Sequence, residues 1–367
     1  MKTLPLLLTI SLALWSCKSG NKEIVQNEKQ IEAKISFWQE QQKGTNFFNQ
    51  TPSTEWFDAA NEANIKFVRL VYDKWKGEEG YFLVGNADQF SGIVEKDFAK
   101  LKTYLDYANT LDIKVVICPI TIPGEIWVQS NNGKKDGRLW TASGFVDQVA
   151  HFWKDLALRL KDHPAIVGYN LVNEPHPEIY FDKYSFWDAD LAQWYKSVEG
   201  SPADLNVFNE KVVQSIRMVD TETPIILESG FYATPWAFDY LRPINDEKII
   251  YSFHMYEPYA FTTKRINKGQ YAYPGKMIID DTGEEFGLNR ESLAQFFHPV
   301  KAWAKEHEIP SNRIWVGEFG CNRHVEGVEH YLADLISIFN ENEWHWSFYA
   351  YREDTWEAMD YELGTEK

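Results

Sequence analysis

The stretch from Ile166 to Pro175 reads IVGYNLVNEP, a short apolar run that ends in polar residues. A run that is apolar on both faces is typical of a strand buried inside a parallel sheet. Seven other stretches resemble it, and together they make eight predicted strands: Thr45–Phe48, Lys66–Val71, Ile113–Pro119, Ile166–Val172, Ile225–Glu228, Ile249–Met255, Ile314–Glu318 and Trp346–Tyr351.

The segments between these runs have the period of amphipathic helices. Apolar residues recur on one face within residues 94–108, 149–160, 205–219, 293–303 and 328–339. Strands that alternate with such helices indicate a parallel sheet covered by helices. Eight repeats favour a closed (β/α)₈ barrel, a TIM barrel of the α/β class, as a single domain. No Gly-x-Gly-x-x-Gly follows the first strand, which removes the main support for a nucleotide-binding fold.

The sequence after the eighth predicted strand is short for a complete barrel. Only residues 352–367 follow the eighth run, too few for a full closing helix. We therefore expect either that the last helix is missing or that the segment Glu28–Gln42 covers the gap.

The first 17 residues predict the compartment. Lys2 precedes a mostly apolar run from Leu4 to Trp15 that is too short to span a bilayer and is typical of a secretion signal. Its end at Ser16-Cys17 resembles the lipobox of bacterial lipoproteins, in which the cysteine receives the lipid. We expect a signal peptide over residues 1–17, a flexible tether over 18–35 and the barrel over 36–367. An ordinary signal peptide with an incidental cysteine is the alternative.

The charge and the cysteine content of the chain limit the classes of partner and ligand that we expect. The formal net charge of −17 repels phosphate backbones, so nucleic acid is excluded as a partner and a neutral ligand is favoured over a polyanion. Besides Cys17, only Cys118 and Cys321 are present, which implies no disulfide framework. No metal-ligand spacing such as His-Glu-x-x-His occurs, and we expect no metal or cofactor. Membrane contact is expected only through a lipid on Cys17, and the protein is expected to be a monomer.

Polar residues at the carboxyl ends of the strands are the candidates for chemistry, because the active site of such a barrel lies at that end. The fourth run ends in Asn173-Glu174-Pro175, and the seventh ends in Gly317-Glu318-Phe319. Strands four and seven face each other across the mouth, so the two carboxyl groups can meet. Two carboxyl groups are the minimum for glycosidic hydrolysis, and a separation of about 5 Å favours a retaining mechanism.

The sequence around these residues resembles glycoside hydrolase family 5, the cellulase and β-mannanase family of retaining (β/α)₈ enzymes. The resemblance rests on IVGYNLVNEP and on three further stretches: FVRL from Phe67, SFHMYEP from Ser252 and WVGEFG from Trp315.

The resemblance implies a role for each matching residue. Glu174 is the acid/base and Glu318 the nucleophile, while Arg69 matches the arginine of the family's second strand. His254 and Tyr256 would reach the substrate from the sixth strand. They are two residues apart and therefore point to the same face. Tyr256 and Arg69 would contact Glu318, with Arg69 depressing its pKa. Asn173 would bind the 2-hydroxyl of the sugar.

Two positions depart from the family pattern. The third strand, VVICPIT from Val115, lacks the family's histidine, and Thr121 is a possible substitute. On the eighth strand the family places a stacking tryptophan, for which this sequence offers Trp346 and Tyr349 without deciding between them. The further aromatic candidates for the cleft are Trp140, Trp127, Trp236 and Trp356. Glu228, which ends the fifth strand, is either a cleft residue or a structural one.

These observations predict a retaining hydrolase that cleaves internal β-1,4 linkages of a neutral polysaccharide, with β-glucan as the first choice. A β-mannanase and an exo-acting β-glycosidase of the same family remain alternatives. A surface lipoprotein that binds glycans without cleaving them is an alternative of another class. The protein is expected to be secreted and lipid-anchored, at the periplasmic or cell-surface face of a bacterial membrane.

Overall fold

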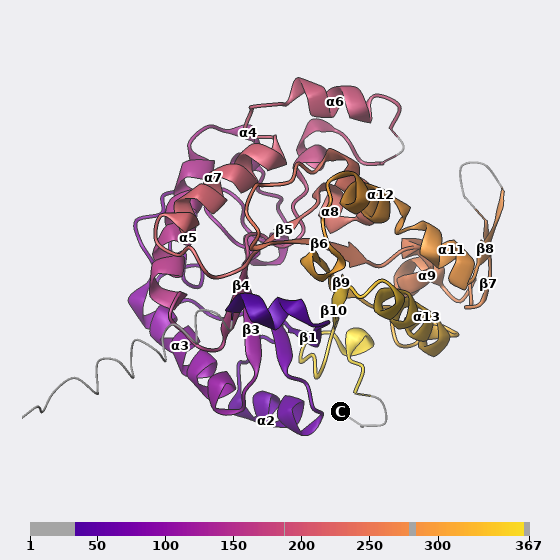
Figure 1. The fold of residues 1–367 in the computed structure, drawn as a ribbon, viewed down its shortest axis with the longest axis horizontal. Coiled ribbons are helices and arrows are strands. Elements are labelled where there is room, and N and C mark those ends of the chain that lie inside the picture. Colours follow the sequence, from indigo (N-terminus) through magenta and orange to yellow (C-terminus); the bar gives the residue numbers. More distant parts are fainter. Residues whose placement is uncertain (1–33, 187, 279–283, 363–367) are drawn as a thin grey trace, which may run out of the picture.

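A computed structural model describes residues 34–186, 188–278 and 284–362, and these form a closed barrel of eight parallel strands (Figure 1). The strand order around the barrel is β1-β10-β9-β6-β5-β4-β3-β2. The bounds of the barrel strands are β1 Lys43–Phe47, β2 Phe67–Val71, β3 Lys114–Cys118, β4 Ile166–Asn170, β5 Ile225–Glu228, β6 Ile249–Met255, β9 Ile314–Phe319 and β10 His345–Phe348. All eight predicted strands are present, and the prediction of a single (β/α)₈ barrel is confirmed.

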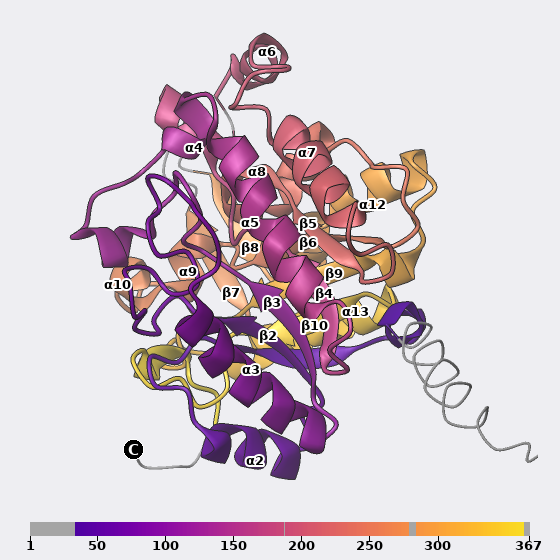
Figure 2. The ribbon, with the colours of Figure 1, turned by 90° about the vertical axis from the view of Figure 1, so that its left-hand side faces the viewer.

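Among the described residues, six longer helices surround the strands: α2 Thr54–Glu62, α3 Glu95–Thr110, α5 Phe145–Leu160, α7 Leu205–Arg217, α12 His298–Glu306 and α13 Val328–Glu341. Their apolar faces pack on the strands in one large core, as the helical periods predict. Figure 2 shows α3, α5 and α7 following one another along one side of the barrel. Side-chain caps begin two of these helices, since Ser53 accepts from the amide of Trp56 in α2 and Asp204 from that of Asn206 in α7.

Shorter elements occupy the loops and both ends of the chain. The short α-helices are α4 Arg138–Thr141, α6 Leu191–Ser197, α8 Gly230–Ala233, α9 Tyr259–Thr262, α10 Lys264–Asn267 and α11 Arg290–Gln295. The 3₁₀ helices are η1 Phe37–Gln39, η2 Val128–Asn131, η3 Pro177–Phe181, η4 Pro235–Tyr240, η5 Ser311–Arg313 and η6 Glu357–Met359.

An antiparallel hairpin of β7 (Gly275–Ile278) and β8 (Glu285–Leu288) projects from the edge of the molecule, and the sequence did not predict it (Figure 1). No helix formed by the described residues is long and apolar enough to cross a membrane.

The described N-terminal segment closes the floor of the barrel. Trp38 in η1 is buried among Phe67, Trp315 and His345, and its Nε1 donates to the carbonyl oxygen of Val167 at 2.8 Å. We expected the segment Glu28–Gln42 to cover the gap left by a closing helix, and the described part of that segment lies instead under the barrel. Within residues 349–362, the described chain after β10, only η6 forms.

The boundary predicted for the tether moves by a few residues. Lys34, which was expected to lie in the tether, is buried and donates to the hydroxyl of Thr223 at 3.3 Å. The folded body therefore includes Lys34. The predicted signal peptide, Cys17 and most of the predicted tether lie outside the described residues.

Candidate active site

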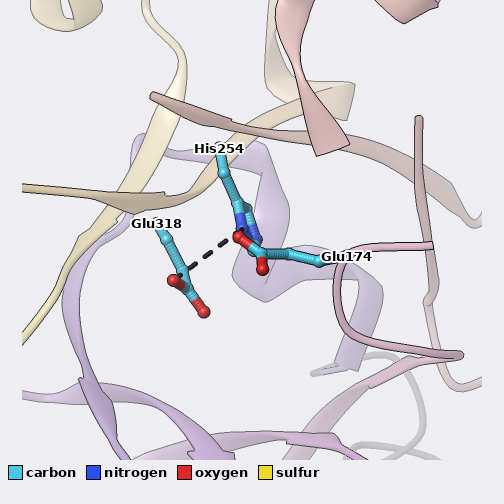
Figure 3. A group of neighbouring side chains, drawn as sticks. All are labelled: Glu174, His254 and Glu318. Atoms are coloured by element: carbon cyan, nitrogen blue, oxygen red, sulfur yellow. Dashed lines mark hydrogen bonds and ion pairs between the residues drawn. The ribbon is translucent and has the colours of Figure 1, made fainter. Parts of the chain in front are cut away.

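The two glutamates predicted from the strand ends meet at one rim of the barrel. Glu174 follows β4, Glu318 lies in β9, and His254 reaches between them from β6 (Figure 3). One carboxylate oxygen of each glutamate and a ring nitrogen of His254 all lie within 4.8 Å of one another. That separation falls in the range of retaining glycosidases, in which the two carboxyl groups are about 5 Å apart.

Glu318 is buried among hydrogen-bond donors. Arg69 Nη1 donates to its Oε1 at 2.6 Å, and the hydroxyl of Tyr256 donates to its Oε2 at 2.7 Å. Burial raises the pKa of the Glu318 carboxyl, against the opposing charges of His254 and Arg69. The predicted pairs with Arg69 and Tyr256 are therefore present. Arg69 lowers this pKa as expected, but burial raises it by more, so the net shift is upward.

Arg69 is the centre of the network below the mouth and is fully buried. Its Nη2 donates to Oδ1 of Asn173 at 2.8 Å and to Oε1 of Glu228 at 2.9 Å. The other acceptors of its guanidinium are Oδ1 of Asn170 at 2.8 Å, Oδ1 of Asn46 at 3.1 Å and Sγ of Cys118 at 3.1 Å. Because its guanidinium donates hydrogen bonds on every side, Arg69 is held in one orientation. It therefore fixes the positions of both the Glu318 carboxylate and the Asn173 side-chain oxygen.

Glu228 is a structural member of the site that the sequence left undecided. It is buried at the end of β5, and its Oε2 accepts from the backbone amide of Glu174 at 2.7 Å. Although burial acts against it, the charges of His254 and Arg69 lower the pKa of Glu228 to about 2. A permanently charged Glu228 thus anchors the backbone that carries Glu174.

His254 completes the charge balance of the network. Its Nδ1 lies 2.9 Å from Oε1 of Glu174 and 3.8 Å from Oε2 of Glu318, and its Nε2 lies 3.3 Å from Oε1 of Glu228. Burial acts to lower the pKa of His254, but the carboxylates of Glu318 and Glu228 raise it to about 10. Two buried cations, Arg69 and His254, therefore face these carboxylates, and the side chain of Glu174 keeps 29% exposure to solvent.

An aromatic-walled hollow of about 480 Å³ opens over Glu318. Asn173, Glu174, Tyr256 and Glu318 line its base. Five rings line the rest of it: Phe48, Trp127, Tyr259, Tyr349 and Trp356. Flat aromatic faces beside polar groups suit a sugar ring, which has apolar C–H faces and a polar rim.

A second hollow of about 670 Å³ lies on the other side of Glu174. It contains Glu174 and His254 together with Tyr232, Trp236 and Tyr259. A third, of about 260 Å³, adjoins Glu174 at His176 and Tyr180. Glu174 thus stands where the hollows meet, and Trp127 and Gln129 continue the first hollow into a further one beside Lys74 and Trp75.

Some predicted aromatic platforms lie elsewhere. Trp140 is fully buried, packs on Phe208 and donates from Nε1 to Oε2 of Glu125 at 3.0 Å, so its prediction as a cleft residue was wrong. The prediction of Trp346 as a stacking residue was wrong because of its place in the strand. In β10 the residues His345 and Ser347 face the barrel interior, so Trp346 faces outward and donates to Asn340 of α13 at 3.3 Å.

Tyr349 is the eighth-strand aromatic that reaches the hollow over Glu318, and Trp127, Trp236 and Trp356 line the hollows as the sequence suggested. Thr121 does not reach the two glutamates. Its hydroxyl accepts from the amide of Trp127 at 3.2 Å and lines the hollow beside Lys74.

Glu174, His254 and Glu318 form the one cluster in the described part of the chain whose ligand atoms are close enough to share a metal ion. Glu318 already accepts hydrogen bonds from Arg69 and Tyr256. Because the Arg69 cation touches this carboxylate, a second cation at the same place is electrostatically disfavoured. The cluster is better suited to proton transfer and nucleophilic attack than to metal binding.

Comparisons with known proteins agree with this geometry. Residues 26–355 match the model of the family described as cellulase (glycosyl hydrolase family 5). Endoglucanase C of Acetivibrio thermocellus is 20% identical over 83% of this chain and 84% of its own length. The β-xylosidase of Phanerodontia chrysosporium is 24% identical over 71% of this chain, which spans half the length of that relative.

Solved structures share the fold. The endoglucanase Cel5A of Thermotoga maritima superposes with a TM-score of 0.63 at 18% identity, covering 91% of this chain and 93% of that one. With the family model matched along nearly the whole barrel, the chain belongs to glycosyl hydrolase family 5, the cellulase family.

Proposed function

We propose that the protein is a retaining, endo-acting β-glycanase that cleaves internal β-1,4 linkages of a neutral polysaccharide, with β-glucan as the first substrate. The observation that carries the proposal is the distance within 4.8 Å between carboxylate oxygens of Glu174 and Glu318. At that distance one carboxylate can reach the anomeric carbon while the other reaches the glycosidic oxygen.

The contacts of each glutamate support its role. Glu318 is the nucleophile, because Arg69 and Tyr256 hold both of its oxygens and aim it into the hollow. Glu174 is the acid/base, because its exposed carboxyl group can exchange protons with water and stands where the hollows meet.

The reaction then has two steps. In the first, Glu318 bonds to the anomeric carbon as the C–O bond to the leaving group breaks, and Glu174 gives its proton to the leaving oxygen. In the second, Glu174 takes a proton from water, whose oxygen replaces Glu318 at the same carbon. Asn173, held by Arg69 through Oδ1, keeps its amide hydrogens for the 2-hydroxyl of the sugar.

The hollows on both sides of Glu174 support internal cleavage. An exo-acting enzyme needs a pocket closed at one end, whereas here the hollow over Glu318 continues past Trp127 and a second hollow begins at Tyr232. The endoglucanase names of several relatives support a β-glucan, and β-mannan remains the next choice. Secretion and lipid attachment at Cys17, at the periplasmic or cell-surface face of a bacterial membrane, are part of the same proposal and would place the enzyme near polymeric glycans.

A glycan panel with product sizing tests the proposal. Purified protein lacking residues 1–17 is incubated with barley glucan, carboxymethylcellulose, glucomannan, mannan and xylan, and reducing ends and product lengths are measured. We expect mixed-length oligosaccharides from the glucans and no products from Glu318→Gln. Only monosaccharide or disaccharide products from the first minutes would favour the exo-acting alternative. Binding without products from any glycan would favour the glycan-binding lipoprotein instead.

A further inference from the structure

The backbone of Glu174 adopts a conformation that few residues with a side chain take. Its φ is 49°, in the left-handed region, where a residue needs outside contacts to stay. Its amide donates to Glu228, and its carbonyl oxygen lies 2.6 Å from Nδ1 of His176, two residues further along. Because a carbonyl oxygen only accepts, Nδ1 of His176 must carry the hydrogen of this bond.

His176 is fixed in turn by its surroundings. Its ring stacks on that of Tyr232 with the centroids 4.3 Å apart and the planes 13° from parallel. Its Nε2 lies 3.7 Å from Oε1 of Glu125. Glu125 is buried, and its other oxygen accepts from Nε1 of Trp140. A line of side chains, buried at Trp140 and Glu125 and 19% exposed at His176, therefore runs from Trp140 through Glu125 to His176 and ends on the carbonyl of Glu174.

The protonation states of His176 and Glu125 are consistent with a hydrogen on Nδ1 of His176. Burial lowers the pKa of His176 to about 4, so the ring is neutral in neutral solution and its one hydrogen is the one on Nδ1. Burial raises the pKa of Glu125 to about 8, so a protonated carboxyl group faces the unprotonated Nε2. The line therefore carries no net charge, and the Nδ1–H of His176 donates to the carbonyl of Glu174, while Glu125 contacts the other ring nitrogen at 3.7 Å, beyond hydrogen-bond distance.

We propose that His176, held by Glu125 and Tyr232, is a positioning residue for the acid/base: its Nδ1–H keeps Glu174 in the left-handed conformation and so directs the Glu174 carboxyl group at the leaving oxygen. This inference rests on the proposed function. It explains why a polar line lies beside the catalytic rim, and it gives Trp140 a role behind the site in place of one within the cleft.

The test uses substrates that differ in their need for an acid. A phenyl β-cellobioside needs protonation of its leaving oxygen, whereas a 2,4-dinitrophenyl β-cellobioside hardly does, and kcat/KM reports bond cleavage for both. His176→Gln moves the side-chain donor to the position of Nε2, and His176→Asn keeps a donor near the position of Nδ1. We expect His176→Gln to lose at least about 10-fold on the phenyl substrate and less than about 3-fold on the dinitrophenyl one. His176→Asn should retain most of the wild-type ratio between the two substrates.

A matched control separates positioning from general damage. His163 is a buried histidine that precedes β4 and so lies at the opposite end of that strand from Glu174. His163→Gln should leave the ratio of the two substrates at the wild-type value, whatever it does to the melting temperature. Equal losses on both substrates in His176→Gln, or equal behaviour of the Gln and Asn variants, would overturn the inference. Wild-type protein that cleaves no β-glycoside would instead overturn the proposed function.

Discussion

Replacing Arg69 by methionine removes the one guanidinium that the catalytic rim is built around. Methionine fills much of the same space, but it leaves Glu318 and Glu228 buried without this cation. Burial acts to raise the pKa of Glu228, but the charges of His254 and Arg69 lower it from 4.5 to about 2, and this net shift is worth about 3 kcal/mol of folding free energy. With the lost pairing to Glu318 included, we expect Arg69→Met to lower the free energy of unfolding by about 3–5 kcal/mol at pH 7.

The loss of stability in Arg69→Met should become larger as the pH rises. A carboxyl group whose folded pKa is depressed stabilises the protein above its unfolded pKa of 4.5, and this contribution is lost as the pH falls toward 2. In Arg69→Met the orphaned carboxyl groups hold protons to higher pH, so the penalty grows as the pH rises from 5 to 7. Urea unfolding followed by tryptophan fluorescence at both pH values measures it.

A matched arginine serves as the control for this measurement. Arg138 pairs with Asp136 and Asp88 but keeps 38% side-chain exposure. Arg138→Met should therefore cost less than about 1 kcal/mol. A loss below about 1 kcal/mol in Arg69→Met at pH 7, or one that shrinks as the pH rises, would refute the reasoning.

Three further changes have expected outcomes. Burial raises the pKa of Glu178 from 4.5 to about 7, so the folded protein loses stability as the pH rises through that window. In urea unfolding, the free energy of unfolding of Glu178→Gln should therefore rise relative to that of the wild type by up to about 3 kcal/mol between pH 5 and pH 8. A difference that stays constant over this range would contradict the prediction. Trp38→Ala should lower the free energy of unfolding by about 3–5 kcal/mol, since the barrel floor loses its largest ring, and an unchanged melting temperature would count against the described floor. Trp127→Ala should lower kcat/KM on glucan oligosaccharides by about 10-fold with little change in melting temperature, whereas the reverse pattern would mean that the ring packs the core and does not bind sugar.

The sequence predicts most of the barrel and the heart of the site because both follow from position along a strand. Polar residues at the carboxyl ends of parallel strands must converge, so Glu174 and Glu318 could be placed together without coordinates. The spacing of two between His254 and Tyr256 fixed their common face, and their side chains contact Glu174 and Glu318. The strand-end rule also reached Glu228, but it could not tell a cleft residue from a buried anchor.

The errors lie where tertiary context decides. Trp127 and Trp140 both lie in the long segment between β3 and α5, and only the packing of that segment places Trp140 in the core and Trp127 at the hollow. Trp346 lies in β10 and faces outward, whereas Tyr349 follows the end of β10 and reaches the hollow, and the apolar pattern left this register open. The net pKa shift of Glu318 was missed because its burial cannot be read from the residues around it in the chain.

The stereochemistry of the first product tests the central claim most directly. Proton NMR spectra collected from the first minutes of hydrolysis of cellotetraose show which anomer forms before mutarotation mixes the two. With carboxylate oxygens of Glu174 and Glu318 within 4.8 Å, the β-anomer should appear first and the α-anomer should follow slowly. Initial release of the α-anomer would mean that water attacks directly, and the assignment of Glu318 as a nucleophile that bonds to the sugar would be lost.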